Sequence, residues 1–258
     1  MRILESSAMV ATLLLAHNPT SLPYAPLHSA APDALVARSM AAYAALKSYS
    51  DVGTVAQDAG SFVNRSKFKT FYRKPKDFFF DYTQLRSEYV KLGNSPLKGH
   101  WVFWMRSGNL ETWNEQAKTH DSYPAGVRNQ ISPIAAADAA TSGALPLVAS
   151  FFFQKANLVT VLAELATVSS AGNEKVNGQD CYKLAGIAQS TYPSGKTFNV
   201  RPVTIWIDAK TNLIRKIFVG TPKGYGAGSI STTTIVIDPT PNPALDDAKF
   251  QYTIPAQQ

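Results

Sequence analysis

The sequence predicts a mainly β protein of the α+β class, with one curved antiparallel sheet and a helical insertion. Its 258 residues include 16 Pro, 15 Gly, 11 Tyr, 13 Phe and 4 Trp, a composition that favours many short strands joined by turns. Strand-like runs fill residues 50–115 and resume at Glu174, and an Ala-rich stretch without alternation, residues 124–171, separates them. We therefore expect a single sheet with the insertion against its concave side.

The first 30 residues have the features of a secretory signal peptide. Arg2 supplies a positive charge, Ala8–Ala16 is an apolar run, and small residues at Ser29–Ala31 suit cleavage. The alternative is a short helical or irregular N-terminal tail. No later apolar run reaches the roughly 18 residues that a membrane-spanning helix needs, so we expect an exported, periplasmic protein. Residues 31–258 are expected to form a single domain.

One amphipathic helix is expected before the sheet. Pro32 suits its first turn because the φ angle of Pro is helical, and Asp33 suits it because a negative charge is favourable at the positive end of the helix dipole. The helix should end near Ser48–Ser50. Its mostly apolar face consists of residues at helical spacing: Leu35, Val36, Ser39, Met40, Tyr43 and Leu46.

Alternation and turn residues predict the strands on both sides of the insertion. Before it, we expect Ser50–Gln57, Ser61–Arg73, Asp77–Leu85, His100–Ser107 and Leu110–Glu115. After it, strands resume at Glu174 and continue with Cys181–Ile187, Phe198–Ile207, Leu213–Val219, Ile230–Ile237 and Lys249–Ile254. Within the insertion we expect short helices at Ser132–Thr141 and Leu145–Lys155 and a further helical stripe at Leu158, Val161, Leu162 and Leu165.

Aromatic side chains gather on one face of the first predicted strands. Neighbouring side chains of a strand point to opposite faces, so Phe68, Thr70 and Tyr72 share one face while Lys67 and Lys69 lie on the other. Such a face either fills a core or lines a cavity, and spacing alone does not separate these two cases. Its aromatic members are Phe68, Tyr72, Phe78, Phe80, Tyr82, Trp101 and Phe103.

No combination of residues points to an enzyme, and we expect no catalytic residue, cofactor or metal ion. His100 and His120 do not show the spacing of metal ligands. The Gly-rich residues 224–229 precede a β-branched run, whereas a phosphate-binding loop precedes a helix. Asp77 and Asp81 form a carboxylate pair of the kind that glycosidases use, but alternation places both on the solvent face.

The net charge of +7 suits an anionic partner such as a lipid head group or a membrane surface. Basic residues cluster at residues 65–69 and 73–76, where a solvated strand face is expected. Because export is expected, nucleic acid is not an expected partner. The single cysteine, Cys181, cannot form an intramolecular disulfide and is expected to pack as a small apolar group.

Several segments, in their order along the chain, resemble the outer-membrane lipoprotein carrier, or LolA-like, superfamily. After the predicted helix come Tyr72–Phe80, then Val203–Asp208 with Thr211–Lys216, and then the closing residues 246–255. The strand Val203–Asp208 followed by Thr211–Lys216 is typical of a large, uncharacterised periplasmic branch of the superfamily. The resemblance implies an N-terminal helix, an incomplete antiparallel β-barrel, and a helical lid that closes the open side over a hydrophobic cavity.

The resemblance also implies roles for individual residues. In the carrier, a basic residue just before a Pro holds the lid closed, and the aromatic residue three positions after that Pro faces the acyl chains. These positions are Lys74 and Phe78, although Lys74 replaces an Arg and cannot make a planar bidentate contact. The ligand-binding residues that we expect are Phe68, Tyr72, Lys74, Phe78, Phe80, Tyr82, Trp101 and Phe103.

The leading hypothesis is an exported, non-catalytic protein that binds or carries a lipid, a lipoprotein acyl group or another hydrophobic ligand, with transient contact to a membrane surface. The alternative is an envelope sensor or interaction module that binds another envelope protein without transporting a ligand. The first function requires a concave cavity, and a solid core in its place would contradict it; the lining that we expect is Tyr72, Phe78, Phe80, Trp101 and Phe103. The second function predicts an exposed apolar or basic patch and no cavity of the size of a ligand. An exported hydrolase would need polar groups that converge in a cleft, and the sequence gives no support for them.

Overall fold

The computed structural model describes residues 31–60, 62–89, 99–106, 109–123, 165–191, 197–222 and 231–256. Helix α1 (Pro32–Ala45) is followed by the strands of one sheet and by a short 3-10 helix, η1 (Asp247–Phe250). No helix in these ranges is long and apolar enough to cross a membrane. The strands are β1 (Ser48–Ala59), β2 (Phe62–Arg73), β3 (Asp77–Tyr89), β4 (His100–Arg106), β5 (Asn109–Asn114), β6 (Thr119–Tyr123), β7 (Leu165–Val176), β8 (Gln179–Thr191), β9 (Thr197–Asp208), β10 (Ile214–Val219) and β11 (Thr232–Pro241).

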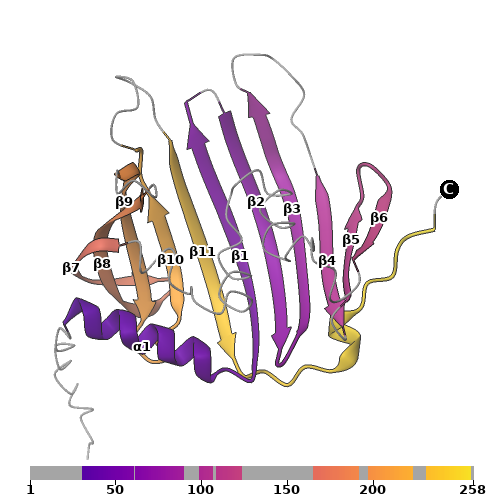
Figure 1. Ribbon diagram of the computed structural model, residues 1–258, viewed down its shortest axis with the longest axis horizontal. Helices are drawn as coiled ribbons and strands as arrows, with labels where there is room; N and C mark the ends of the chain where they lie inside the picture. Colours follow the sequence, from indigo (N-terminus) through magenta and orange to yellow (C-terminus); the bar gives the residue numbers. More distant parts are fainter. Residues whose placement is uncertain are drawn as a thin grey trace, which may run out of the picture.

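The 11-stranded sheet is antiparallel and consists of two meanders that meet at its centre (Figure 1). The spatial order is β6-β5-β4-β3-β2-β1-β11-β10-β9-β8-β7. β1 to β6 run outward to one edge, and β7 to β11 return from the other edge. At the centre, β1 pairs with β11 from Tyr49↔Pro241 to Asp58↔Thr232. The sheet is therefore open, with β6 and β7 at its edges, as the mainly β prediction with an incomplete barrel requires.

Helix α1 packs its apolar stripe against the sheet and crosses the ends of β9, β10 and β11 (Figure 1). Leu35 and Tyr43 are buried there, and Leu46, just after the helix, is buried with them. Pro stands in the first turn together with Asp33, which confirms the predicted start. The helix ends at Ala45, earlier than predicted, because Ser48 already pairs with Arg73 of β2.

The strand register aligns the aromatic residues in rows across the sheet. One row holds Tyr49, Tyr72, Phe78 and Met105, and a second holds Asp51, Thr70, Phe80 and Phe103. A third row holds Gly53, Phe68, Tyr82 and Trp101. Most of these side chains belong to the main core cluster, which also contains Leu35, Tyr43 and Leu46. We call this side the inner face and the opposite side the outer face.

Gly53 makes room for the aromatic ring opposite it. A Cβ atom at this position would lie 2.2 Å from Cζ of Phe68 and 2.7 Å from the carbonyl oxygen of Val236. The ring of Phe68 therefore lies directly over the β1 backbone, a close approach that only a residue without a side chain permits.

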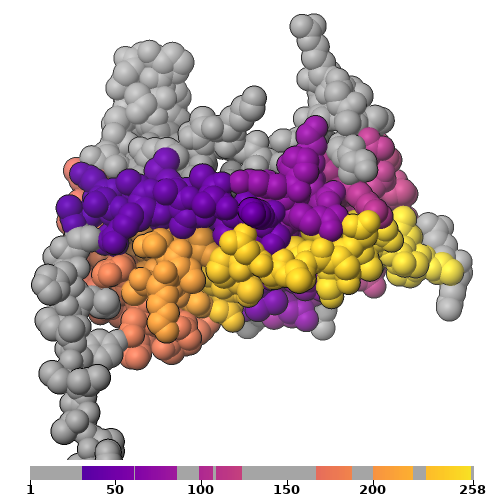
Figure 2. Space-filling view, turned by 90° about the horizontal axis from the view of Figure 1, so that it is seen from below, coloured from indigo at the N-terminus to yellow at the C-terminus, as the bar shows by residue number. Residues whose placement is uncertain are grey.

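The closing segment, Lys249–Ile254, is not the strand that its alternation predicts. Asp246 accepts a hydrogen bond from the backbone amide of Lys249 and caps η1, and residues 251–256 continue without strand pairing. Phe250 is fully buried with Phe79, Val102 and Trp113, and Tyr252 and Ile254 pack against the same cluster. Alternation of apolar and polar residues predicts that one face of the segment is buried. Here the segment buries that face by lying across the outer side of the sheet, without forming strand hydrogen bonds. Figure 2 shows this segment in yellow beside α1 in indigo, along the same end of the molecule.

Two further predictions need correction. Residues 165–171 belong to strand β7, which begins at Leu165, so the predicted helical stripe does not extend to that residue. The reason is that β7 pairs with β8 from Leu165↔Ala188 onward. Strand β6 was not predicted, because its sequence, THDSY, is polar and its side chains are mostly exposed. The signal peptide and the rest of the helical insertion, residues 124–164, lie outside the described residues.

Candidate functional site

The inner face carries a continuous aromatic cluster centred on Phe80. The Phe80 ring centroid lies 6.0 Å from that of Phe68, 6.3 Å from Phe78, 6.2 Å from Tyr82 and 6.1 Å from Phe103. These spacings are the usual ones for favourable aromatic pairs. The cluster thus packs bulky, weakly polar side chains into the main core across β2, β3 and β4.

The structure brings together all the predicted aromatic residues. Tyr82 continues the cluster to Trp101, with ring centroids 5.9 Å apart. Trp101 is partly exposed, whereas its neighbours in the cluster are buried. The buried members are Phe68, Tyr72, Phe78, Phe80, Tyr82 and Phe103.

Lys74 lies apart from the aromatic cluster. It stands in the turn between β2 and β3, and its Nζ donates a hydrogen bond to the carbonyl oxygen of Ala44 over 2.6 Å. This contact holds a cation at the C-terminal end of α1, where the helix dipole favours positive charge. In the described residues, Lys74 therefore fastens α1 to the β2–β3 turn.

A buried carboxyl group lies within the inner face beside Phe80. Asp51 is 3% exposed, and its Oδ2 accepts a hydrogen bond from the Tyr49 hydroxyl over 2.9 Å. Burial raises the pKa of Asp51 to about 7, although Thr70 and Tyr49 act in the opposite direction. Tyr43 lies next to Tyr49, with ring centroids 6.1 Å apart, and its hydroxyl accepts a hydrogen bond from the Ile214 amide. Polar groups thus connect β1 with α1 and β10 beneath the apolar surface.

A second polar group lies at the other end of the aromatic cluster. Ser66 Oγ donates a hydrogen bond to Asn64 Oδ1 over 2.7 Å and lies 2.6 Å from the Tyr82 hydroxyl. Asn64, Ser66 and Gln84 are all buried on the inner face. The inner face therefore has a polar group of Asn64, Ser66 and Gln84 near the β1–β2 hairpin, in addition to Asp51 and Thr70 in the row of Phe80.

The outer face has a hollow of about 800 Å³ that crosses β11, β1, β2 and β3. Its lining includes Val52, Lys67, Lys69, Asp81 and His100. Val52 is 55% exposed there, which is unusual for a large apolar residue at the centre of a sheet.

Charged groups along the outer face are held in ion pairs. His100 Nε2 lies 3.0 Å from Asp81 Oδ1, and His100 Nδ1 lies 2.5 Å from Glu115 Oε2. Hydrogen bonding to Asp81 raises the pKa of His100, burial opposes this effect, and Glu115 reinforces it. Burial alone would raise the pKa of Asp81, but His100 and Lys69 outweigh burial and lower it. The lowered pKa favours the ionised form of Asp81, and the raised pKa favours the protonated form of His100.

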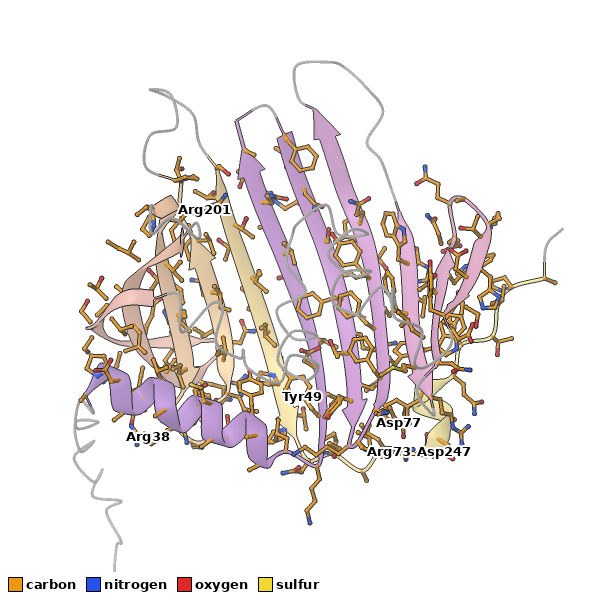
Figure 3. All side chains as sticks on the ribbon, in the orientation of Figure 1. Arg38, Tyr49, Arg73, Asp77, Arg201 and Asp247 are labelled. Carbon is orange, nitrogen blue, oxygen red and sulfur yellow. The ribbon has the colours of Figure 1, made fainter. Side chains whose placement is uncertain are left out.

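The two carboxylates of the candidate pair, Asp77 and Asp81, have different partners. Asp77 Oδ2 accepts a hydrogen bond from Arg73 over 2.6 Å, and Asp81 is paired with His100. In Figure 3, Arg73, Asp77 and Asp247 gather at one end of the sheet, where Arg73 also pairs with Asp247 over 2.7 Å. Asp77 is thus paired with a guanidinium group and Asp81 with an imidazole ring. Within the described ranges, no group of His, Cys, Asp and Glu has the arrangement of a metal site.

Sequence reasoning placed Thr70 on the inner face but missed the other polar residues there, Asp51 above all. Asp51 follows Tyr49 at strand spacing, but a single Asp near the start of a strand resembles a solvent-facing residue. Only the register, which places Asp51 opposite Thr70 of β2, shows that it joins the row containing Phe80. The alternation of Phe68, Thr70 and Tyr72 does place Thr70 on this face from sequence alone.

Comparison with known proteins identifies the fold. No family model matches the sequence, and no curated protein matches it. Among solved structures, LprF from Mycobacterium bovis is similar over 88% of this chain and 99% of its own, with a TM-score of 0.50 and 12% sequence identity. The chain shares the fold of LprF.

More distant matches accompany LprF. The lipoprotein LppX from Mycobacterium tuberculosis covers 83% of this chain and 98% of its own, at a TM-score of 0.45 and 13% identity. A LolA superfamily protein from Nitrosomonas europaea covers 87% of this chain and 99% of its own, at a TM-score of 0.32 and 10% identity. Among the described residues, an open antiparallel sheet follows the N-terminal helix, as the sequence resemblance implies.

Proposed function

We propose that this protein is an exported, non-catalytic protein that binds or carries a hydrophobic ligand, such as a lipid or a lipoprotein acyl group, against the inner face of its half-barrel. The observation that carries the proposal is the aromatic cluster around Phe80 on an open sheet, on the face that the LolA-like resemblance assigns to acyl chains. A closed barrel would fix the size of the space above that face, whereas an open sheet can accept ligands of different size.

The energetics suit transport of a lipid. An acyl chain gains about 0.8 kcal/mol for each methylene that leaves water. A contact with Phe68, Phe80 and Trp101 over many methylenes would therefore stabilise a ligand in water. We expect this contact to involve the aromatic residues of the cluster around Phe80. Lys74 has a different role, because it supports the C-terminal end of α1.

Native mass spectrometry of the purified full chain, followed by extraction with organic solvent, tests this function. We expect additional mass that the extract identifies as a lipid or an acylated peptide. Trp101→Ala on the inner face should reduce the bound fraction at least threefold, whereas Trp104→Ala on the outer face should not. Trp104 is a matched control because it is also partly exposed and lies on the same strand. Equal loss of ligand in both variants, or no ligand in any preparation, would contradict the proposal.

A second candidate function is recognition of an envelope protein by the outer face. The observation that favours it is the hollow beside the exposed Val52, which Lys67 borders together with the Lys69–Asp81 ion pair and Asp238. Lys67 on this border suits an acidic side chain of a peptide segment whose apolar residue would pack on Val52. A photoreactive residue at position 52 should then crosslink one envelope protein in cells, and an excess of an acidic competitor peptide should abolish the product. Absence of a specific product would remove this candidate.

A further inference from the structure

Two large apolar side chains are exposed on the outer face, and both line one continuous groove. Among the described side chains, Val52 is 55% exposed and Leu85 is 49% exposed, and the other large apolar ones are less open to water. Val52 lines the hollow of about 800 Å³, and Leu85 lines a second hollow of about 580 Å³. Because Thr83 and His100 line both hollows, the two join into one groove, which we call the outer groove.

The strand register gives the spacing of the two exposed side chains. Val52 of β1 is opposite Lys69 of β2, which is opposite Asp81 of β3, and Leu85 follows further along β3. Neighbouring strands lie about 4.8 Å apart and each residue advances the chain by about 3.3 Å, so Val52 and Leu85 lie roughly 16 Å apart on a diagonal of the sheet. An extended peptide covers this distance with about five residues.

Lys67 lies midway along this diagonal. It belongs to β2, which runs between β1 and β3 (Figure 1), and it is opposite Thr54 on one side and Thr83 on the other. Its side chain is exposed, and no carboxylate among the described residues forms an ion pair with it. A cation without a charged partner therefore stands between the two apolar positions.

The carboxylates that line the outer groove, by contrast, already have cationic partners. These pairs are Asp81 with Lys69 and His100, Glu115 with His100, and Asp238 with Arg215. The pairing offsets the negative charge of the groove and leaves the charge of Lys67 uncompensated at its centre. An acidic side chain is complementary to Lys67, and apolar side chains gain free energy by leaving water against Val52 and Leu85.

We propose that the outer groove binds an extended segment of an envelope protein in which an acidic residue lies midway between two apolar residues about five positions apart. The apolar residues pack on Val52 and Leu85, and the acidic residue pairs with Lys67. This inference rests on the second candidate function, and it adds the position and the sequence pattern of the bound segment.

Titration of the purified full chain with synthetic peptides, followed by NMR of its Val and Leu methyl groups, tests the pattern. The matched peptide is Gly-Ser-Leu-Ser-Asp-Ser-Ser-Leu-Ser-Gly. One comparison peptide has the same composition with adjacent leucines, and another has Lys in place of Asp. We expect the matched peptide to shift the methyl signals of Val52 and Leu85 and to bind about fivefold more tightly than either comparison peptide.

Variants of the exposed groove residues assign the contacts. Leu85→Ser should remove the preference for the matched peptide over the one with adjacent leucines. Lys67→Glu should weaken binding of the matched peptide about fivefold and strengthen binding of the peptide with Lys, because the charges are then exchanged. Lys210→Glu is the matched control, since Lys210 is exposed in the turn between β9 and β10 and lines neither hollow.

Several results would overturn the proposed groove specificity. They are no methyl shift with any peptide, equal affinity for the matched and adjacent-leucine peptides, and a charge exchange at Lys67 that restores nothing. Loss of peptide binding in Trp101→Ala would place the peptide on the inner face and would overturn it as well. The second candidate function is decided separately, because crosslinking at position 52 in cells does not depend on these peptides.

Discussion

The Tyr49 hydroxyl donates a hydrogen bond to Asp51 Oδ2 over 2.9 Å, and both side chains are buried on the inner face of β1. The contact places a carboxyl group inside an aromatic core, where the charged form is poorly solvated. Burial accordingly raises the pKa of Asp51 from 3.8 to about 7.

The first prediction concerns the dependence of stability on pH. Because the pKa of Asp51 is raised in the folded state, its stabilising contribution is complete below about 3.8 and is lost as the pH rises through about 7. Wild type should therefore lose about 2–3 kcal/mol of unfolding free energy, relative to Asp51→Asn, between pH 5 and pH 8.5. Tyr43 and Tyr49 do not titrate in this range, because burial raises the pKa of each above 10. Urea denaturation at both pH values measures the difference. Parallel curves for the two proteins would show that Asp51 is not desolvated.

The second prediction concerns the C-terminal segment on the outer face. Phe250 is fully buried with Phe79, Val102 and Trp113, and the guanidinium of Arg73 lies 4.8 Å from the centre of its ring. Phe250→Ala should lower the unfolding free energy by about 3–5 kcal/mol, because it leaves a cavity in this cluster. Denaturation with guanidinium chloride provides the value. The matched change at an exposed position of the same segment, Gln251→Ala, should have little effect, and a small effect of Phe250→Ala would mean that the segment is not docked.

The third prediction concerns a buried ion pair between β9 and β10. Arg215 Nε donates to Asp208 Oδ2 over 2.5 Å, and Arg215 Nη1 donates to Asp238 Oδ1 over 2.7 Å. The Arg215 side chain is only 9% exposed and that of Asp208 only 3%. Arg215→Ala should therefore cost about 3–5 kcal/mol, since it leaves a buried carboxylate without its partner. Lys175→Ala removes the exposed pair with Asp180 and should change stability by less than about 0.5 kcal/mol. Similar thermal shifts for the two variants would contradict this account.

The fourth prediction concerns the close approach of Phe68 to β1. A methyl group at position 53 would overlap both the Phe68 ring and the Val236 carbonyl oxygen. Gly53→Ala should destabilise the protein by about 1–3 kcal/mol, because the ring and the backbone must shift. Gly172→Ala offers a comparison in which the added Cβ meets no atom within 4 Å, so any cost there comes from the positive φ of that residue. Chemical denaturation of both variants separates overlap from backbone strain. A Gly53→Ala variant as stable as wild type would show that Phe68 does not lie over β1.

Much of the sheet could be predicted from the sequence because its strands alternate clearly. Phe68, Tyr72, Phe78 and Phe80 alternate with charged or outward residues, and the structure places them on one buried face. Turn residues also defined strand ends, as at Gly60, whose φ angle of 60° suits its place after β1. Local sequence was sufficient here because neighbouring residues determine strand period and turn geometry.

Other features depend on contacts between distant residues, and the sequence did not reveal them. The pairing of β1 with β11 joins residues at opposite ends of the chain. The alternation of Phe250 and Tyr252 predicted burial of one face correctly but not how that burial occurs, since docking on Phe79 replaces strand pairing. Asp51 looked like a surface residue because its burial depends on register with β2 and on the aromatic residues around it.

The position of a bound acyl chain is the most direct test of the account. Among the four tryptophans of the chain, Trp101 packs with the inner-face cluster, whereas Trp104, Trp113 and Trp206 belong to clusters of the outer face. Titration with 9,10-dibromostearate should quench the tryptophan fluorescence of wild type and of Trp104→Phe, and Trp101→Phe should lose most of that quenching. Quenching that persists in Trp101→Phe and disappears in Trp104→Phe would place the chain on the outer face and contradict the central claim.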